Sequence, residues 1–215
     1  MSNEPLSIII LLGGLSLVPI FFILTTSFVK ISMVCILARE SLGVQQVPPN
    51  IVIYGLSLVL SFYVMGPVYN NSFNNLNNYV TNGTPVTAQI LINEFQSSSQ
   101  PVRNFLLKHS DRNNREFFNQ SLKKFWPPEM VSKVTPQDFI ILVPAFMVSE
   151  LTQGFKIGFL IYLPSIIIDI IVSNILMAMG MMMMSPVSIS LPIKLLLFIS
   201  INGWSRLLRV LLNTY

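Results

Sequence analysis

The stretch MAMGMMMMSPVS, from Met177 to Ser188, places six methionines within eight residues and ends them with Ser185-Pro186. Four consecutive methionines, Met181 to Met184, would point to all sides of a helix, so they cannot all face one core. Gly180 favours the end of a helix before them, and Pro186 favours a new start after them. We therefore expect two apolar helices that form a hairpin joined by a methionine loop.

A loop at membrane depth is stable only where protein buries it or where it lines a cavity. Methionine has a flexible, unbranched side chain with a polarizable sulfur. In a ring of copies, such loops would form a deformable apolar gasket that closes on itself yet yields to a passing chain. The alternative is that the methionines fill a core, which is the usual role of scattered residues such as Met33, Met65 and Met147.

The composition is that of a membrane protein. Of the 215 residues, 52% are hydrophobic and only 10% are charged, whereas soluble domains carry about 25% charged residues. The single Cys35 allows neither an intramolecular disulfide nor a metal site built from cysteines. The net charge of +4 is spread over loops, which disfavours nucleic acid as a partner. With one histidine, His109, and no zinc-binding or phosphate-binding motif, we expect no cofactor.

The N-terminal part predicts a hydrophobic helical hairpin. Residues 5–29 contain no charged side chain and could cross a hydrocarbon core of about 30 Å, with a kink or a break at Gly13, Gly14 or Pro19. Farther along, Gly43 is a plausible helix C-terminal residue and Asn50 a plausible N-cap. A second uncharged helix is expected over residues 51–69.

From Asn70 the composition changes to the asparagine-rich NNSFNNLNNYVTNG, and no run long enough to span a membrane follows before Phe139. Within this insert, REFFNQSLKKFWPP predicts a helix with Phe118, Leu122 and Phe125 on one face, ended by Pro127-Pro128. We therefore predict an all-α protein with about four hydrophobic segments. Its parts are an N-terminal hairpin (1–69), a polar helical insert (70–137) and C-terminal hairpins with the methionine loop (138–215).

The orientation of the insert can be argued from charge. It contains seven Lys or Arg against four Asp or Glu, a net charge of +3, but the positive-inside bias is reliable only for loops shorter than about 60 residues. The short connector that carries Lys30 and Arg39 is the better indicator, and it favours the cytoplasmic side. We therefore expect the insert to face the periplasm.

Four ionisable residues lie in the apolar C-terminal third: Glu150, Lys156, Asp169 and Lys194. Each Lys or Asp at the centre of a lipid-facing helix would cost about 2.5–3.5 kcal/mol. Glu150 and Lys156 point to different faces of one helix and cannot pair with each other. The charges are therefore predicted to be buried, with partners from another segment or subunit. The alternative is that they end helices and snorkel to water.

The sequence resembles the FliP/SctR family, the export-gate proteins of bacterial type III secretion systems. The resemblance lies in SEL (149–151), LPSIIIDIIVSN (163–174), GMMMMSP (180–186) and SLPIKLLLF (190–198), together with LGVQQVPPN (42–50) in the N-terminal half. It covers nearly the whole chain and is weakest across the insert. Flagellar members usually begin with a cleavable signal peptide, and the acidic MSNEP start does not resemble one, so the chain is more similar to the injectisome branch, which serves virulence secretion.

The resemblance implies a function. Family members assemble as a ring of five, which two smaller export-gate proteins complete and a switch protein joins, in the bacterial inner membrane. The complex is a pore for unfolded substrates, and its methionine seal would consist of Met181, Met182, Met183 and Met184. The resemblance also implies an ion pair between Glu150 and Lys194 that holds the ring together.

The sequence leaves two other classes of function to consider. An enzyme could use Ser149 beside Glu150, with Lys156 nearby, but their spacing does not bring a base within hydrogen-bond reach of the nucleophile. We therefore predict that the chain is not an enzyme. The more serious alternative is a structural scaffold that conducts nothing.

Overall fold

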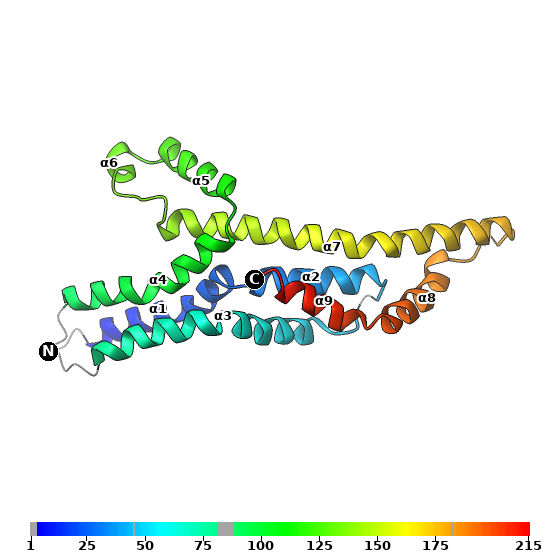
Figure 1. Cartoon of the computed structure of the whole chain (residues 1–215), viewed down its shortest axis with the longest axis horizontal. Coiled ribbons are helices and arrows are strands. Elements are labelled where there is room, and N and C mark those ends of the chain that lie inside the picture. Colours follow the sequence, from blue (N-terminus) through cyan, green and yellow to red (C-terminus); the bar gives the residue numbers. More distant parts are fainter. Residues whose placement is uncertain (1–3, 45, 81–87, 182) are drawn as a thin grey trace. The chain divides into compact units, whose positions relative to one another are not determined.

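The computed structural model describes residues 4–44, 46–80, 88–181 and 183–215. Every regular element among them is a helix, which confirms the predicted all-α class (Figure 1). The helices are α1 (Glu4–Thr25), α2 (Phe28–Ser41), α3 (Asn50–Val80), α4 (Ala88–His109), α5 (Arg112–Phe125), α6 (Pro128–Val131), α7 (Phe139–Ala178), α8 (Pro186–Ser200) and α9 (Gly203–Leu212).

The helices form two compact units, each assembled from segments that are far apart in the sequence. One combines Met1–Val29 with Met65–Glu150, and the other combines Lys30–Val64 with Leu151–Tyr215. α3 and α7 each contribute to both units. The predicted division at residues 69/70 and 137/138 rests on composition and not on packing, and it stays a prediction.

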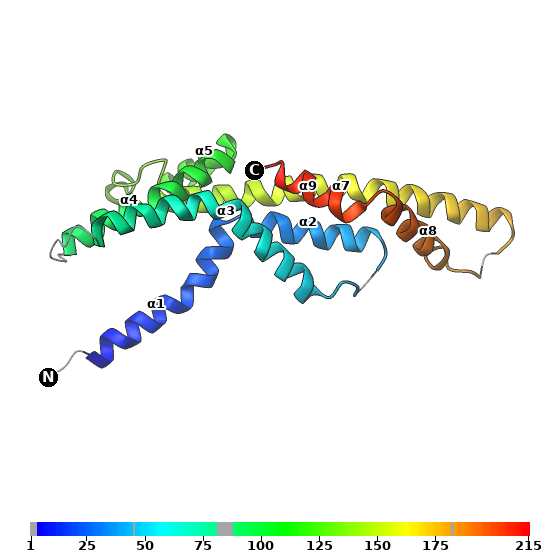
Figure 2. The same cartoon turned by 60° about the horizontal axis from the view of Figure 1, so that its bottom comes forward.

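The second unit is built around α2. Ile31, Val34, Cys35 and Ala38 of α2 are fully buried and form a core with Ile53 of α3 and with Leu207 and Leu211 of α9. Figures 1 and 2 show α9 alongside α2 and α7 in both views. The chain bends by 62° between α8 and α9. The bend lies at Asn202, which has φ 51°, a left-handed conformation that asparagine tolerates.

The first unit has a smaller core between α4, α5 and the beginning of α7. Phe105 packs against Phe146 with ring centroids 5.8 Å apart, and Leu106, Ile141 and Leu142 are fully buried. Asp111 caps α5, because its carboxylate accepts a 2.7 Å hydrogen bond from the backbone N–H of Asn113. The insert is therefore helical, as predicted.

Several predicted boundaries need correction. α1 is one helix through Gly13, Gly14 and Pro19, and the break lies at Thr26 and Ser27 instead. The second predicted helix, 51–69, continues as α3 through the asparagine-rich run to Val80. An asparagine costs only a few tenths of a kcal/mol in a helix, so composition alone does not end one.

Other local predictions are confirmed. Gly43, with φ 77°, follows the end of α2, and its N–H donates to Glu40 O at 3.0 Å. α5 ends at Phe125, just before Pro127. Its predicted apolar face is correct only in part: Leu122 is buried and Phe118 is half-buried, but Phe125 is exposed.

Among the described residues, two helices are long and apolar enough to cross a membrane, with spans at Asn50–Phe73 and Phe139–Ala178. Up to four spans result if the bent pairs α1–α2 and α8–α9 each count as one. The 40 residues of α7 extend about 60 Å, twice the thickness of the hydrocarbon core. Part of this helix must therefore lie outside the lipid or be covered by protein.

Candidate functional site: the methionine hairpin and its buried charges

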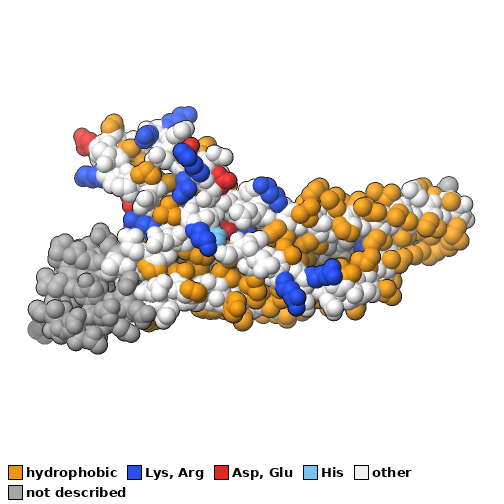
Figure 3. All heavy atoms as spheres, viewed as in Figure 1, with side chains coloured by type: hydrophobic (Ala, Val, Ile, Leu, Met, Phe, Trp, Pro, Cys, Tyr) orange, Lys and Arg blue, Asp and Glu red, His pale blue; other side chains and the backbone are white. Residues whose placement is uncertain are grey.

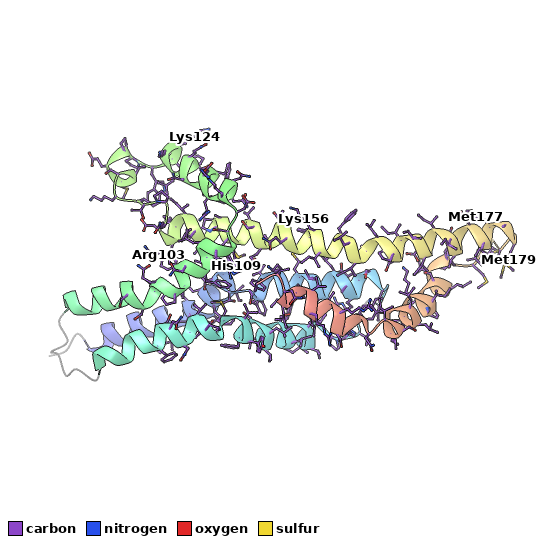
Figure 4. All side chains as sticks on the ribbon, viewed as in Figure 1. Arg103, His109, Lys124, Lys156, Met177 and Met179 are labelled. Carbon is purple, nitrogen blue, oxygen red and sulfur yellow. The ribbon has the colours of Figure 1, made fainter. Side chains whose placement is uncertain are left out.

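The methionine loop joins α7 to α8 at the tip of a hairpin, where Figure 4 labels Met177 and Met179. Gly180 has φ 71° and donates its N–H to Met177 O at 3.0 Å, while Met181 N–H donates to Leu176 O at 2.9 Å. This pair of bonds is the Schellman motif, which closes a helix with a left-handed glycine. α8 then begins at Pro186. The predicted break in the helix is confirmed.

The described methionine side chains of the loop lie outside the chain's own core. Met181 is 37% exposed, Met184 is 43% exposed and Met183 is fully exposed. Met182, the remaining residue of the predicted seal, lies outside the described residues. Within the single chain, the described methionines of the loop are therefore not core filler, and their apolar side chains are available to another surface.

A polar cluster crosses the same hairpin. Lys194 of α8 is 5% exposed, and its Nζ donates to Asp169 Oδ2 of α7 at 2.6 Å. The hydroxyl of the buried Ser190 donates to the other oxygen, Asp169 Oδ1, at 2.5 Å. This arrangement agrees with the expectation that the charges find partners on another segment. Asp169 itself is only half-buried.

The other member of the predicted ion pair, Glu150, is fully buried in α7. It belongs to the first unit and Lys194 to the second, and within the chain Lys194 binds Asp169. The pairing of Glu150 with Lys194 therefore stays a prediction. Lys156 is exposed on the single chain, because its position on α7 faces away from the packed side near Gly154 and Gly158 (Figure 4), so its predicted burial stays a prediction about the assembly.

Ser149 is not an activated nucleophile, because its hydroxyl is occupied by three hydrogen bonds. It donates to Ala145 O at 2.7 Å and accepts from Asp111 N at 2.8 Å and from Asn114 Nδ2 at 2.9 Å. One donor and two acceptor positions are all that a hydroxyl has. Ser149 therefore fastens the start of α5 to α7. Among the described residues there is no cluster of three His, Cys, Asp or Glu that could hold a metal ion.

Lys30 and Arg39 have a structural role that the sequence did not reveal. In the sequence they only indicated which side of the membrane their segment occupies. Lys30 is fully buried, with Nζ 3.2 Å from Gln153 Oε1 and 3.7 Å from the ring centroid of Tyr215. Arg39 is 8% exposed and donates to Asn50 Oδ1 at 2.6 Å. The available signal was GFKIG (154–158), since Gly154 leaves room for the Lys30 side chain.

Much of the hairpin's surface is apolar and uncovered. Figure 3 shows the hydrophobic side chains that gather along α7 and α8. Within the second unit, a half-open groove of about 380 Å³ runs beside Lys194 and is lined mainly by aliphatic residues of α7, α8 and α9. An apolar surface of this extent indicates that lipid or other protein chains cover it.

Comparison with known proteins agrees with this picture. The FliP family model matches residues 11–211. The chain is 45% identical over 213 residues to the "Yop proteins translocation protein R" of Yersinia pestis, covering 99% of this chain and 97% of that protein. It is 43% identical over 214 residues to the "Virulence protein YscR" of Salmonella typhimurium, covering 99% and 98%.

A third relative, the "Harpin secretion protein HrcR" of Erwinia amylovora, is 41% identical over 225 residues, covering 99% of this chain and 97% of that protein. The family match takes in α7, the methionine loop and α8, and the alignments with these relatives run nearly end to end. The chain therefore belongs to the FliP family.

Proposed function

We propose that this protein is a subunit of the export gate of a type III secretion system of the injectisome branch. It has no enzymatic role. In this proposal, copies of the chain form a closed ring in the bacterial inner membrane, five by family resemblance. Together with the two smaller export-gate proteins and the switch protein, the ring makes the pore through which unfolded virulence substrates pass. Relatives named for translocation or secretion support this reading.

One observation carries the proposal: the described methionines at the tip of an apolar hairpin are exposed on the chain that bears them. In a ring, the same loop of each copy would meet its neighbours at the axis and close the aperture. The three flexible bonds and soft sulfur of methionine would let the seal conform to many different passing side chains.

The test replaces Met181, Met182 and Met183 together with Ala and, separately, with Leu. The triple Ala complex should assemble but leak ions, because the aperture widens while no core is emptied. The triple Leu complex should seal but secrete more slowly. Complex yield, membrane conductance and substrate secretion are measured, with Phe73→Ala of α3, which is exposed at 65% and distant in sequence from the loop, as the control that should change none of them.

A triple Ala protein that fails to assemble would instead assign these residues to a core, where each loss costs about 2–5 kcal/mol. A complex that assembles and stays tight to ions would favour the non-conducting scaffold. The mass of the detergent-extracted complex gives the number of copies and shows whether two smaller partners are present.

We also propose that residues 70–137 face the periplasm, because Lys30 and Arg39 of α2 bias the segment between the first two hydrophobic stretches toward the cytoplasm. Both cations are buried, so a labelling experiment and not the charge count decides the orientation. In a Cys35→Ala background, Ser132→Cys should react with a membrane-impermeant thiol reagent in intact spheroplasts. Gln46→Cys, in the α2–α3 connector, should react only after lysis. The reverse pattern would invert the topology.

A further inference from the structure

An exposed patch of aromatic residues and lysines lies on the insert, on α5 and α6. It consists of Phe117, Phe125, Trp126 and Met130, which are 62%, 77%, 39% and 57% exposed, together with the exposed Lys123, Lys124 and Lys133. We call it the aromatic–lysine patch. Figure 3 shows orange and blue side chains interspersed on this lobe, and Figure 4 labels Lys124 there.

The helical register explains why this side of α5 is uncovered. Leu122 packs inward and is buried, while Phe117 and Lys124, seven residues apart, lie about 20° from each other on the outward side. The turn after Trp126 leads directly into α6, whose Met130 N–H donates to Pro127 O at 3.0 Å. Phe117 and Phe125 of the capped helix α5, Trp126 of the turn after it and Met130 of α6 are thus exposed on the insert.

The charges around the patch are mainly positive. Asp111 is engaged in capping α5 and Glu116 is bound by Arg112 at 2.8 Å, so Glu129 is the remaining acid of α5 and α6, against three lysines. Exposed aromatic rings with flanking lysines match the interface of a bilayer, where rings lie at the headgroup level and lysine ammonium groups reach the phosphates. The same polypeptide enters the apolar span of α7 at Phe139, shortly after Lys133.

We propose that the aromatic–lysine patch docks on the surface of a bilayer that contains anionic phospholipid. The rings of Phe117, Phe125 and Trp126 enter the headgroup layer, and Lys123, Lys124 and Lys133 bind lipid phosphates. The docking holds the insert down on the same membrane that α7 enters. It does not depend on which side of that membrane the insert occupies, nor on conduction through a pore.

The test uses the fluorescence of Trp126 in the full chain. The protein contains two tryptophans, so Trp204→Phe leaves Trp126 as the only one and keeps an aromatic ring beside Phe198. This protein is reconstituted in nanodiscs of phosphatidylcholine alone or with phosphatidylglycerol. Brominated lipid should quench Trp126 strongly in the anionic discs and weakly in the neutral ones, and water-soluble iodide should do the opposite.

Charge variants separate attraction to lipid from local structure. Replacing Lys123, Lys124 and Lys133 with Gln should lower the ratio of docked to undocked insert about 100-fold, so that quenching falls to the level of the neutral discs. The triple Arg variant keeps the charge and should be quenched like the parent. Added salt should weaken quenching in the parent and have little effect in the triple Gln variant.

Two results would overturn the proposal. One is a Trp126 that iodide reaches equally in both kinds of disc, with no quenching by brominated lipid. The other is a Trp126 that stays exposed on discs but becomes shielded in the assembled secretion complex, which would assign the patch to a protein partner. Quenching by lipid that is unchanged in the triple Gln variant would contradict the role of the anionic headgroups.

Discussion

The two ends of α7 belong to one continuous helix and are both strongly apolar, yet they differ in what covers them. Near the beginning, Ile141, Leu142, Ala145 and Phe146 are completely buried, at a spacing that places them on one face. Near the end, Ile167, Ile170, Ile171 and Ile175 are each more than half exposed. The first stretch is packed by its own unit, whereas the second offers an apolar surface to lipid or to other chains.

The difference shows that hydropathy reports how much a helix must be covered but not by what. Within the part of the chain that the structure describes, Val172 and Leu176 are buried near the methionine loop, but most of the aliphatic residues around them are exposed. A substitution near the beginning of α7 should therefore act on the stability of the chain. One near the end should act on assembly.

The largest contrast is expected between two phenylalanines of α7. Phe146→Ala empties a fully buried site and should lower the free energy of unfolding by about 3–5 kcal/mol. Phe155→Ala removes a side chain that is 59% exposed and should change it by less than about 0.5 kcal/mol. Unfolding of the detergent-solubilised chain is followed by circular dichroism. Equal losses for the two variants would remove the distinction between the buried and the exposed positions of α7.

The next prediction concerns the two buried charges Glu150, on α7, and Lys194, on α8. Glu150→Ala and Lys194→Ala should each weaken ring assembly, because leaving one buried charge without its partner typically costs about 3–5 kcal/mol. The double variant with the two charges exchanged should recover part of the assembly on a native gel. Here the structure sharpens the test, since Lys194 binds Asp169 at 2.6 Å within the chain.

Asp169→Asn is the discriminating control for that experiment. If it reproduces the loss seen with Lys194→Ala while Glu150→Ala assembles normally, Lys194 acts through the hairpin and not through Glu150. If the exchanged double variant recovers assembly, the ion pair between Glu150 and Lys194 is supported.

A smaller effect is expected at Ser149, which fastens α5 to the beginning of α7. Ser149→Ala leaves the Asp111 N–H and the Asn114 amide without their acceptor. It should lower the free energy of unfolding by about 1–3 kcal/mol. Ser200→Ala is the matched control, because the exposed Ser200 hydroxyl only donates to Leu196 O of its own helix. Thermal unfolding of both variants checks the prediction, and a Ser149→Ala protein as stable as the control would contradict it.

Local chemistry explains which parts of the fold could be predicted. Gly43 and Gly180 end helices through left-handed backbone, and Pro127 and Pro186 mark boundaries that depend on residues close in sequence. The extension of α3 to Val80 and the exposure of Phe125 depend on what lies beside each helix, which no local pattern contains. Pro19 shows the same limit of local patterns. Proline usually ends or kinks a helix, but α1 continues through Pro19.

The candidate site divides in the same way. The methionine loop was predictable because four identical residues between a helix end and a helix start leave few alternatives. The partner of Lys194 was not, because Asp169 lies across the loop and its position depends on how α7 and α8 align. The burial of Lys30 depends on Gly154 of α7, which is distant in sequence and recognisable only once α2 and α7 are known to pack together.

The last prediction locates where α7 stops being packed by its own chain. It uses two glycines that face α2. A Cβ on Gly158 would lie 2.3 Å from Leu37 Cδ1 and 3.1 Å from Leu37 Cβ. Rotation of the Leu37 side chain can move Cδ1 but not Cβ, so the helices must separate slightly. Gly158→Ala should cost about 1–3 kcal/mol.

A Cβ on Gly154 would meet the flexible end of Met33 at 3.2 Å, with Lys30 Cγ and Val34 Cγ2 at 3.7 and 3.8 Å. Gly154→Ala should therefore be neutral, or stabilising by up to about 1 kcal/mol through helix propensity. Unfolding of the detergent-solubilised variants by circular dichroism measures both. If Gly158→Ala were as harmless as Gly154→Ala, the contact between α2 and α7 would not limit stability. The part of α7 that depends on its own chain would then end before Gly158.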